Sequence, residues 1–222
     1  MDIYVEGNIG TGKTTFLDFL KTLFSKNNHS FVYEPVDQWT NLKDSNGKNL
    51  LEHFYEDQNK WSFAFQMNSF VSRIEKIQNI EKDFPENIKF IERSVYTDKK
   101  CFANNCYETG KMNKIEFDIY NRWHTWLCQE FKVKPSAFIY LKTTPEISLE
   151  RINKRNRGGE SGIPIDYLTK LDTLHNVWMD EERANGVPVL ILDVSKDFYN
   201  DESEKQIIIG KLKEFMETLH KN

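Results

Sequence analysis

Eight residues near the amino terminus have the types and the spacing needed to bind the phosphates of a nucleotide. The segment from Gly7 to Thr14 reads GNIGTGKT and matches the pattern G-x-x-x-x-G-K-[ST] throughout. Its glycines would let backbone N–H groups wrap a phosphate, while Lys13 would neutralise the β- and γ-phosphates and the Thr14 hydroxyl would bind Mg²⁺. A glycine-rich turn without function is the alternative, but the full match between an apolar run and a helical stretch disfavours it. We therefore expect a nucleoside triphosphate at Gly7, Asn8, Ile9, Gly10, Thr11, Gly12, Lys13, Thr14 and Thr15.

Charged residues also stand where three short apolar runs end. Glu6 ends the run before the phosphate loop, Glu34 follows the second run, and Glu92 and Arg93 follow the third. In open α/β sheets, ligands bind outside the carboxyl ends of the strands. A carboxylate at the end of a buried strand is poorly placed for bulk water and well placed for a site. We therefore expect these residues to lie close to the phosphate loop.

The positions of these residues depend on an alternation of short apolar runs with longer helical patterns. The runs are rich in β-branched and aromatic residues, as expected for strands buried on both faces of a parallel sheet. We predict strands at residues 3–5, 30–33, 88–91, 137–141 and 187–192, and helices at about residues 14–24, 57–82, 113–131, 145–157, 164–185 and 201–220. This order predicts an α/β fold with a five-stranded parallel sheet flanked by helices on both faces. Because there is no internal repeat or linker, residues 1–222 are expected to form a single domain.

The composition argues against several other classes of function. The chain has 222 residues, a formal net charge of −4, 39% hydrophobic residues and 29% charged residues. These values suit a globular protein and not a nucleic-acid-binding surface, which needs a basic footprint. No apolar run reaches the length of a membrane span, and no basic leader is apparent, so we expect a cytoplasmic protein, organellar only if a leader has been removed. The spacing of Cys101, Cys106 and Cys128 fits neither a disulfide framework nor a metal site, which predicts reduced, interior thiols.

Six motifs, in order along almost the whole chain, resemble those of the deoxynucleoside kinases. They are GNIGTGKT at 7–14, EPVDQW at 34–39, WSFAFQ at 61–66, ERSVYTDKKCF at 92–102, YLKTTPEISLERINKRNR at 140–157 and LDVSKDF at 192–198. The resemblance implies a P-loop kinase fold with an arginine-rich lid at about residues 151–163, and a homodimer. It also implies transfer of the γ-phosphoryl group of ATP, or of another nucleoside triphosphate, to the 5′-hydroxyl of a deoxynucleoside, with Mg²⁺ as cofactor.

The same resemblance assigns roles around the acceptor. Glu34 resembles the general base that takes the proton of the 5′-hydroxyl, and Arg93 resembles the arginine that holds this base and the 5′-oxygen. Glu92 would join Thr14 in binding Mg²⁺. Gln66 would read the edge of the nucleobase, since an amide donates and accepts at once. Trp39, Phe65 and Phe102 would form apolar walls around the acceptor. Tyr55 and Glu160 would contact its sugar 3′-hydroxyl.

Each of these acceptor assignments has a structural alternative. For Glu34 it is a helix cap or an ion pair. For the aromatic residues it is core packing, and this alternative is strongest for Phe65 and weakest for Trp39 because Trp39 lies within EPVDQW.

The donor side would be completed by arginines after the fourth strand. Arg151 and Arg155 are four residues apart and share a helix face, while Arg157 lies where the helix runs into two glycines. Guanidinium groups that converge on the migrating phosphate would stabilise its charge, and the glycines would supply a hinge. A solvated basic helix end is the alternative. Asp197 and Phe198 resemble the loop that wraps the donor base, largely through backbone atoms.

Two positions indicate which deoxynucleoside the chain prefers. Arg73 lies seven residues after Gln66, on the same helix face, and Asp98 follows the ERS motif. They match the Arg and Asp found together in deoxycytidine and deoxyguanosine kinases. Such a pair suits an amino-bearing base and would crowd a 5-methyl group. We expect deoxycytidine, deoxyadenosine or deoxyguanosine to be preferred over thymidine, with a surface salt bridge as the alternative.

Other classes of protein are less well supported. A thymidylate-type nucleoside monophosphate kinase shares the phosphate loop, but the carboxylate of Glu34 would repel an acceptor phosphate. A non-catalytic nucleotide-binding module would be expected to lose Lys13, Glu34 or the lid arginines, and all are present. Within the family, a thymidine-preferring enzyme is the alternative. The aromatic stretch at residues 120–126 suits a dimer interface and core packing equally well, and His124 within it is expected to be packed and not catalytic.

Overall fold

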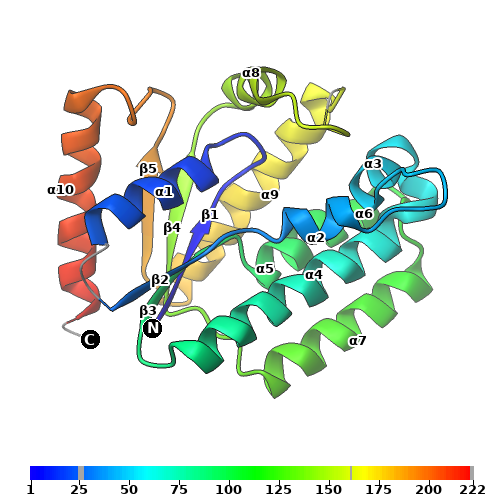
Figure 1. The fold of residues 1–222 in the computed structure, drawn as a ribbon, viewed down its shortest axis with the longest axis horizontal. Helices are drawn as coiled ribbons and strands as arrows, with labels where there is room; N and C mark the ends of the chain where they lie inside the picture. The colour runs from blue at the N-terminus through cyan, green and yellow to red at the C-terminus, as the bar shows by residue number, and fades with distance from the viewer. Residues whose placement is uncertain (25–27, 161, 221–222) are drawn as a thin grey trace.

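A five-stranded parallel sheet forms the centre of the molecule in the computed structural model, which describes residues 1–24, 28–160 and 162–220 (Figure 1). The strand order is β2-β3-β1-β4-β5, and each neighbouring pair is parallel. The strands are β1 (Asp2–Glu6), β2 (His29–Val32), β3 (Ile88–Glu92), β4 (Ala137–Lys142) and β5 (Val189–Asp193). The predicted α/β fold with five parallel strands is therefore confirmed, with strand ends shifted by one or two residues.

The strand order determines where a ligand can bind. The chain leaves the central strand β1, passes to the edge strand β2, returns to β3 and then crosses to β4 on the other side of β1. Ligands bind at such a reversal, outside the carboxyl ends of the strands. The register pairs Val5 with Glu92 and Glu6 with Tyr140, so the charged carboxyl ends of β1 and β3 lie at the same end of the sheet.

Two layers of helices cover the sheet. One face packs against α1 (Lys13–Phe24) and α10 (Glu202–Leu219), and the other packs mainly against α4 (Gln58–Asp83) and α9 (Ile165–Ala184) (Figure 1). Successive strand residues point to opposite faces. In β1, Ile3 and Val5 accordingly belong to the α1 and α10 core, while Tyr4 belongs to the α9 core.

A third hydrophobic cluster holds helices beside the carboxyl edge of the sheet. It joins α4 to α2 (Val36–Asn41), α3 (Leu50–Glu56) and α7 (Lys114–Glu130), with Phe54, Phe70 and Tyr120 nearly inaccessible to solvent. The sequence did not predict the short helices here and after β3, which are α2, α3, α5 (Val95–Thr97), the π-helix η1 (Asp98–Ala103) and α6 (Asn104–Glu108). Helices this short lack the length over which a periodic pattern can be read.

The lid segment predicted at residues 151–163 begins within α8 (Pro145–Arg155), and Ser161 lies outside the described residues. The helix ends at Arg155, and the cap residue Asn156 adopts a left-handed conformation (φ 48°). Arg157 therefore lies beyond the helix and not within it.

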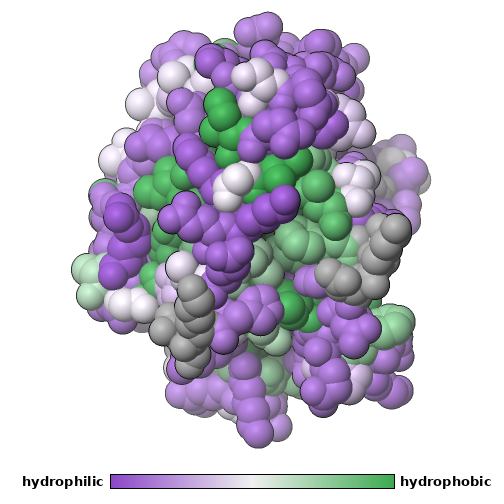
Figure 2. All heavy atoms as spheres, turned by 90° about the vertical axis from the view of Figure 1, so that its left-hand side faces the viewer, coloured by the Kyte–Doolittle hydropathy of each residue, from purple (hydrophilic) through white to green (hydrophobic). Residues whose placement is uncertain are grey.

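The molecular surface on the side of α10 is mixed in character. Figure 2 shows hydrophobic atoms in a band across this face, with hydrophilic residues above and below. Through the part of the chain that the structure describes, no helix combines the length and the apolar character needed to span a bilayer. The three cysteines are free, with Cys101 and Cys106 buried and Cys128 half-buried.

Candidate active site

A cavity of about 610 Å³ opens at the carboxyl ends of the strands. Its volume is in the range of small-molecule sites. Most residues predicted for the donor, acceptor and metal sites line it, namely Ile9, Gly10, Thr11, Gly12, Lys13, Thr14, Thr15, Glu34, Trp39, Tyr55, Phe65, Gln66, Arg73, Glu92, Arg93, Asp98, Phe102, Arg151, Arg155, Arg157, Glu160, Asp197 and Phe198. The structure does not place Gly7 and Asn8 on the cavity wall.

Gly7 and Asn8 instead shape the phosphate loop from behind. Their carbonyl oxygens accept hydrogen bonds from the Lys13 ammonium, at 3.1 and 2.8 Å, and the Asn8 amide donates to the carbonyl of Leu168. At Gly10 the backbone has φ 82°, and a Cβ would lie 2.4 Å from the carbonyl oxygen of Ser148. A side chain there would push the loop away from α8, so the glycine is required.

Lys13 lies in surroundings that oppose its charge. The side chain is buried, and burial, with the charge of Arg93, lowers its pKa from 10.5 to about 7 despite three nearby carboxylates. A bound triphosphate would reverse this effect, because an adjacent anion favours the charged ammonium.

Thr14 and Glu92 meet beside the loop, as the predicted metal site requires. The Thr14 hydroxyl donates to the Glu92 carboxylate at 2.6 Å. Across the described ranges, no group of three or more His, Cys, Asp or Glu side chains could hold a metal ion. Mg²⁺ in phosphoryl-transfer sites takes one or two protein oxygens, with phosphates and waters as its other ligands. A hydroxyl and a carboxylate in contact fit that requirement.

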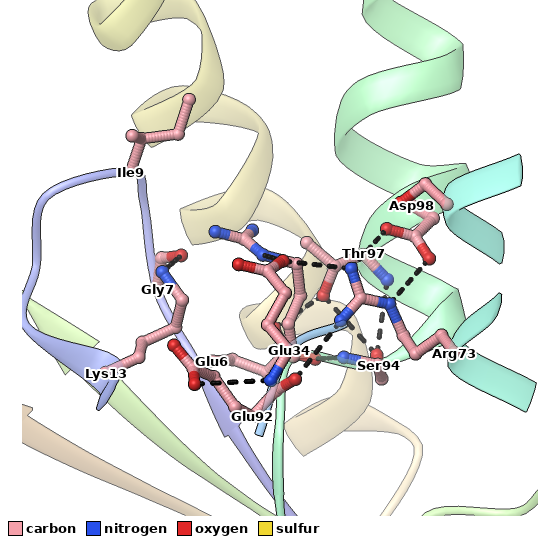
Figure 3. A network of polar contacts seen from close by, with 12 residues as sticks. Glu6, Gly7, Ile9, Lys13, Glu34, Arg73, Glu92, Ser94, Thr97 and Asp98 are labelled. Carbon is pink, nitrogen blue, oxygen red and sulfur yellow. Dashed lines mark hydrogen bonds and ion pairs between the residues drawn. The ribbon is translucent and has the colours of Figure 1, made fainter. Parts of the chain in front are cut away.

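The carboxylate of Glu34, which is 16% exposed, is the centre of a largely buried charge network (Figure 3). Arg73 and Arg93 both donate to its Oε1 atom, at 2.9 and 3.1 Å. Burial acts to raise the pKa of Glu34, but the charges of the two arginines and of Lys13 outweigh it and lower the pKa to about 2. Glu34 is therefore held ionised, in a fixed position, beside the phosphate loop.

Arg73 extends this network to Asp98. It donates to the two carboxylate oxygens of Asp98 at 2.9 and 3.2 Å, and to the backbone carbonyl of Glu92 at 3.2 Å. Arg73 and Asp98 are each 2% exposed, so the alternative of a surface salt bridge is wrong. Asp98 is the first residue of the π-helix η1, a rare element that often occurs at functional sites.

Aromatic residues and one amide form the wall around this network. The Arg93 guanidinium lies 4.8 Å from the centre of the Phe102 ring, and Trp39 donates from its indole N–H to Ser72. Phe65 stacks on Phe54 at 4.4 Å, so core packing accounts for much of its environment even though it reaches the cavity. For Gln66, 1% exposed, the described residues offer no hydrogen-bond partner to the side-chain nitrogen.

Glu160 brings together Arg155 and Arg157, two of the three arginines predicted to form a lid. Arg155 donates to one oxygen of its carboxylate, and Arg157 donates to the other at 3.2 Å. Burial, followed by the charges of Glu160 and Glu34, raises the pKa of Tyr55, whose side chain also lines the cavity. Arg151 is separate from this group, because its guanidinium donates to the carbonyls of Val194 and Ser195 at 2.7 and 3.3 Å.

The segment after β5 combines a cavity wall with core packing. Phe198 packs edge-on against Phe16 and Phe19 in the hydrophobic core. The Asp197 carboxylate accepts from the amides of Tyr199 and Asn200, and so shapes its own turn. Both side chains thus have partners within the protein, although Asp197 is exposed.

The sequence left part of the cavity unassigned. Leu51, Phe54, Ser69, Lys154, Lys196 and Tyr199 also line the cavity. Lys154 and Lys196 precede predicted site residues directly, so proximity in the chain was an available signal. Leu51 and Phe54 lie on α3, which the sequence did not predict.

His124 is buried, with its Nε2 atom hydrogen-bonded to the Val95 carbonyl at 3.1 Å, and burial lowers its pKa to about 4.

A phosphate loop beside an arginine-held carboxylate is suited to positioning a hydroxyl for attack on a terminal phosphate. Fold and site together define a P-loop kinase. The family model for deoxynucleoside kinase matches residues 3–217. The chain is 37% identical to human deoxycytidine kinase and 36% identical to deoxycytidine kinase 1 of Xenopus laevis, each over 98% of this chain and 91% of the relative. It is 35% identical to the mitochondrial deoxyguanosine kinase of Xenopus laevis, over 96% of this chain and 88% of that protein.

The chain therefore belongs to the deoxynucleoside kinase family. The predictions of an ATP-dependent kinase and of deoxynucleoside phosphorylation for nucleotide salvage are confirmed.

Proposed function

We propose that this chain transfers the γ-phosphoryl group of ATP, or of another nucleoside triphosphate, to the 5′-hydroxyl of deoxycytidine or of a purine deoxynucleoside, in preference to thymidine. The observation that carries the proposal is the buried Arg73–Asp98 pair, joined through Arg73 to Glu34 at the cavity wall. Relatives named as deoxycytidine and deoxyguanosine kinases support the same substrate class.

Glu34 would orient the 5′-hydroxyl and accept its proton. A carboxylate with a pKa of about 2 is a weak base at neutral pH. The loose transition state of phosphoryl transfer needs little activation of the nucleophile, so the position of the carboxylate matters more than its basicity. Arg93 would keep Glu34 in that position and would contact the 5′-oxygen through its Nη1 atom, to which no described residue is bonded.

On the donor side, the amides of the phosphate loop and Lys13 would bind the β- and γ-phosphates. Thr14 and Glu92 would hold Mg²⁺, which would neutralise phosphate charge. Arg155 and Arg157 would leave Glu160 to contact the transferred group, and Arg151 would remain near the donor base. In this lid, guanidinium groups would stabilise charge that develops only during transfer.

The nucleobase of the acceptor would lie among Gln66, Arg73 and Asp98. The side-chain nitrogen of Gln66, buried and without a partner in the described chain, is available to donate to a base edge. Phe102 and Trp39 would cover the faces of the base, while Tyr55 and Glu160 would contact the sugar 3′-hydroxyl.

The test is an initial-rate assay with Mg·ATP and each of the four deoxynucleosides, with thymidylate as a fifth acceptor. We expect the highest kcat/KM for deoxycytidine or for a purine deoxynucleoside. A highest value for thymidine would contradict the preference and keep the family reaction. Turnover of thymidylate alone would contradict the acceptor and the role of Glu34.

We also propose that the chain is a homodimer that pairs through α7. This helix exposes Trp123 (45%) and Trp126 (51%), with Ile115 (72%) on the same helix. Exposed aromatic residues of this kind are enriched at protein interfaces. Light scattering should give the mass of two chains, and Trp126→Glu should give one. An unchanged mass for the variant would exclude this face.

A further inference from the structure

We propose that Glu6 is a positioning residue of the kinase reaction, because its carboxylate fixes the turn that carries Arg93 and Asp98. Only the kinetic test of this inference rests on the proposed function; the positioning of the turn does not. Figure 3 shows the side chain of Glu6 near Ser94 and Thr97, on the β1 side of the network around Glu34.

The bonding of Glu6 is unusual for a buried carboxylate. The residue is fully buried, and no ion pair in the described chain includes it. Its Oε1 atom accepts from the Ser94 backbone N–H at 2.8 Å, and its Oε2 atom accepts from the Thr97 hydroxyl at 2.5 Å. Removing a carboxylate from water is costly. The gain is two charge-assisted hydrogen bonds, which are stronger than neutral ones.

The two residues that Glu6 binds are the chain neighbours of two site residues. Ser94 follows Arg93 directly, and Thr97 precedes Asp98 directly. Any movement of this turn would therefore shift both Arg93, which donates to Glu34, and Asp98, which accepts from Arg73. Fixing Ser94 and Thr97 thus fixes both ends of the charge network.

Arg93 needs such support because its backbone lies in the left-handed region, at φ 63°. A residue other than glycine persists there only where its surroundings hold it. The Arg93 N–H donates to the carbonyl of Val5 at 2.9 Å, and the next N–H, that of Ser94, donates to the Glu6 side chain. Two successive amides are thus fixed by two successive residues of β1. Gly7 follows Glu6, so the same strand end carries the phosphate loop and anchors the acceptor turn.

Thr97 offers a cleaner test than Glu6, since truncating Glu6 would leave a cavity in the core. Thr97→Val keeps the size and removes the hydroxyl that donates to Glu6, while Thr97→Ser retains it. Tyr96→Phe is the matched control, because it removes another hydrogen bond of the same short helix, the one from the Tyr96 hydroxyl to the Val133 carbonyl at 2.8 Å.

In Thr97→Val, kcat/KM for the deoxynucleoside should fall about tenfold or more, as expected for loss of one hydrogen bond to a charged group. The Kd for ATP should stay within about twofold, since the phosphate loop keeps its own contacts. Thr97→Ser should restore kcat/KM. Tyr96→Phe should lower the melting temperature and leave kcat/KM unchanged. Unchanged kinetics in Thr97→Val, or equal losses for donor and acceptor, would overturn the proposal.

Hydrogen exchange distinguishes failure of this inference from failure of the proposed function, because it needs no substrate. Amides of residues 93–98 should exchange several-fold faster in Thr97→Val than in wild type or Thr97→Ser. If wild type fails to phosphorylate deoxynucleosides and this difference is present, the proposed function is wrong and the positioning of the turn stands. If the exchange is unchanged, the positioning role is wrong whatever the reaction.

Discussion

Removing Arg73 and Asp98 singly and together tests whether they act as one unit that selects the substrate. Arg73 carries the positive charge between Asp98 and Glu34. Arg73→Met removes the one ion-pair partner that the buried Asp98 has in the described chain and leaves Glu34 with Arg93. Asp98→Ala leaves a buried guanidinium with Glu34 as its one carboxylate partner. Breaking a buried ion pair from one side costs about 3–5 kcal/mol. For a chain of this size, that lowers the melting temperature by roughly 10 °C.

The double variant restores the charge balance, and so its cost should be close to that of one single variant. If the two losses were independent, they would add to about 6–10 kcal/mol. A coupling energy of about 3 kcal/mol or more is therefore expected from denaturant unfolding of the four proteins. The control is Lys100→Met, which breaks the 3.0 Å ion pair with Glu181. Both of those side chains are about half exposed, so less than about 1 kcal/mol should be lost.

The same four proteins test the selection of the base. Room for a methyl group is worth about 1–3 kcal/mol in a binding pocket. The double variant should therefore raise kcat/KM for thymidine relative to deoxycytidine by about tenfold or more. Additive losses of stability would refute the idea of a charge-balanced unit. A coupled pair with an unchanged substrate ratio would refute the crowding of the methyl group.

Three further predictions follow from the site. Glu34→Gln should lower kcat by about 10²–10⁴-fold with little change in the Kd for ATP, and retained turnover would remove Glu34 from the role of base. Binding of ATP near pH 7 should draw about half a proton from the buffer, because the Lys13 pKa of about 7 must rise beside phosphate. Calorimetry in buffers of different ionisation enthalpy measures this proton uptake, and zero uptake would contradict the prediction. Gly159→Ala should lower kcat/KM more than Gly162→Ala. Both glycines have positive φ, but only at Gly159 would a Cβ meet the Glu52 backbone, at 3.3 Å. Equal effects in the same assay would mean that backbone strain alone lowers the activity.

The sequence predicts the sheet well because its strands are short apolar runs between long helical patterns. The fully buried run Ala137–Leu141 shows no alternation, and this absence itself indicates a strand covered on both faces. The segments between β2 and α4 and after β3 were not predictable in the same way. Their helices are short, and α3 begins with a capping box between Asn49 and Glu52 and not with a periodic pattern.

The sequence also predicts which residues reach the cavity better than it predicts their partners. Glu34, Arg73 and Asp98 are far apart in the chain, and the resemblance gave their positions. The sharing of one Glu34 oxygen by two arginines is a property of the folded chain alone. The hydrogen bonds from Arg155 and Arg157 to the Glu160 carboxylate are also a property of the folded chain alone, because they depend on how the chain turns after α8.

Most of the unforeseen geometry concerns one turn. From the sequence, the third strand ends at Glu92 and Arg93 with no helix predicted before residue 113, and nothing in ERSVYTD indicates a left-handed Arg93 or a π-helix that begins at Asp98. Both are unfavourable by themselves, and both aim a side chain at Glu34 or at its partner Arg73. Local sequence rules fail where tertiary contacts impose an unfavourable local conformation. Glu6 is such a contact, and it lies 88 residues before the Ser94 amide that it binds. A charged residue at the end of a central strand therefore serves to fix a neighbouring turn as well as to bind a ligand.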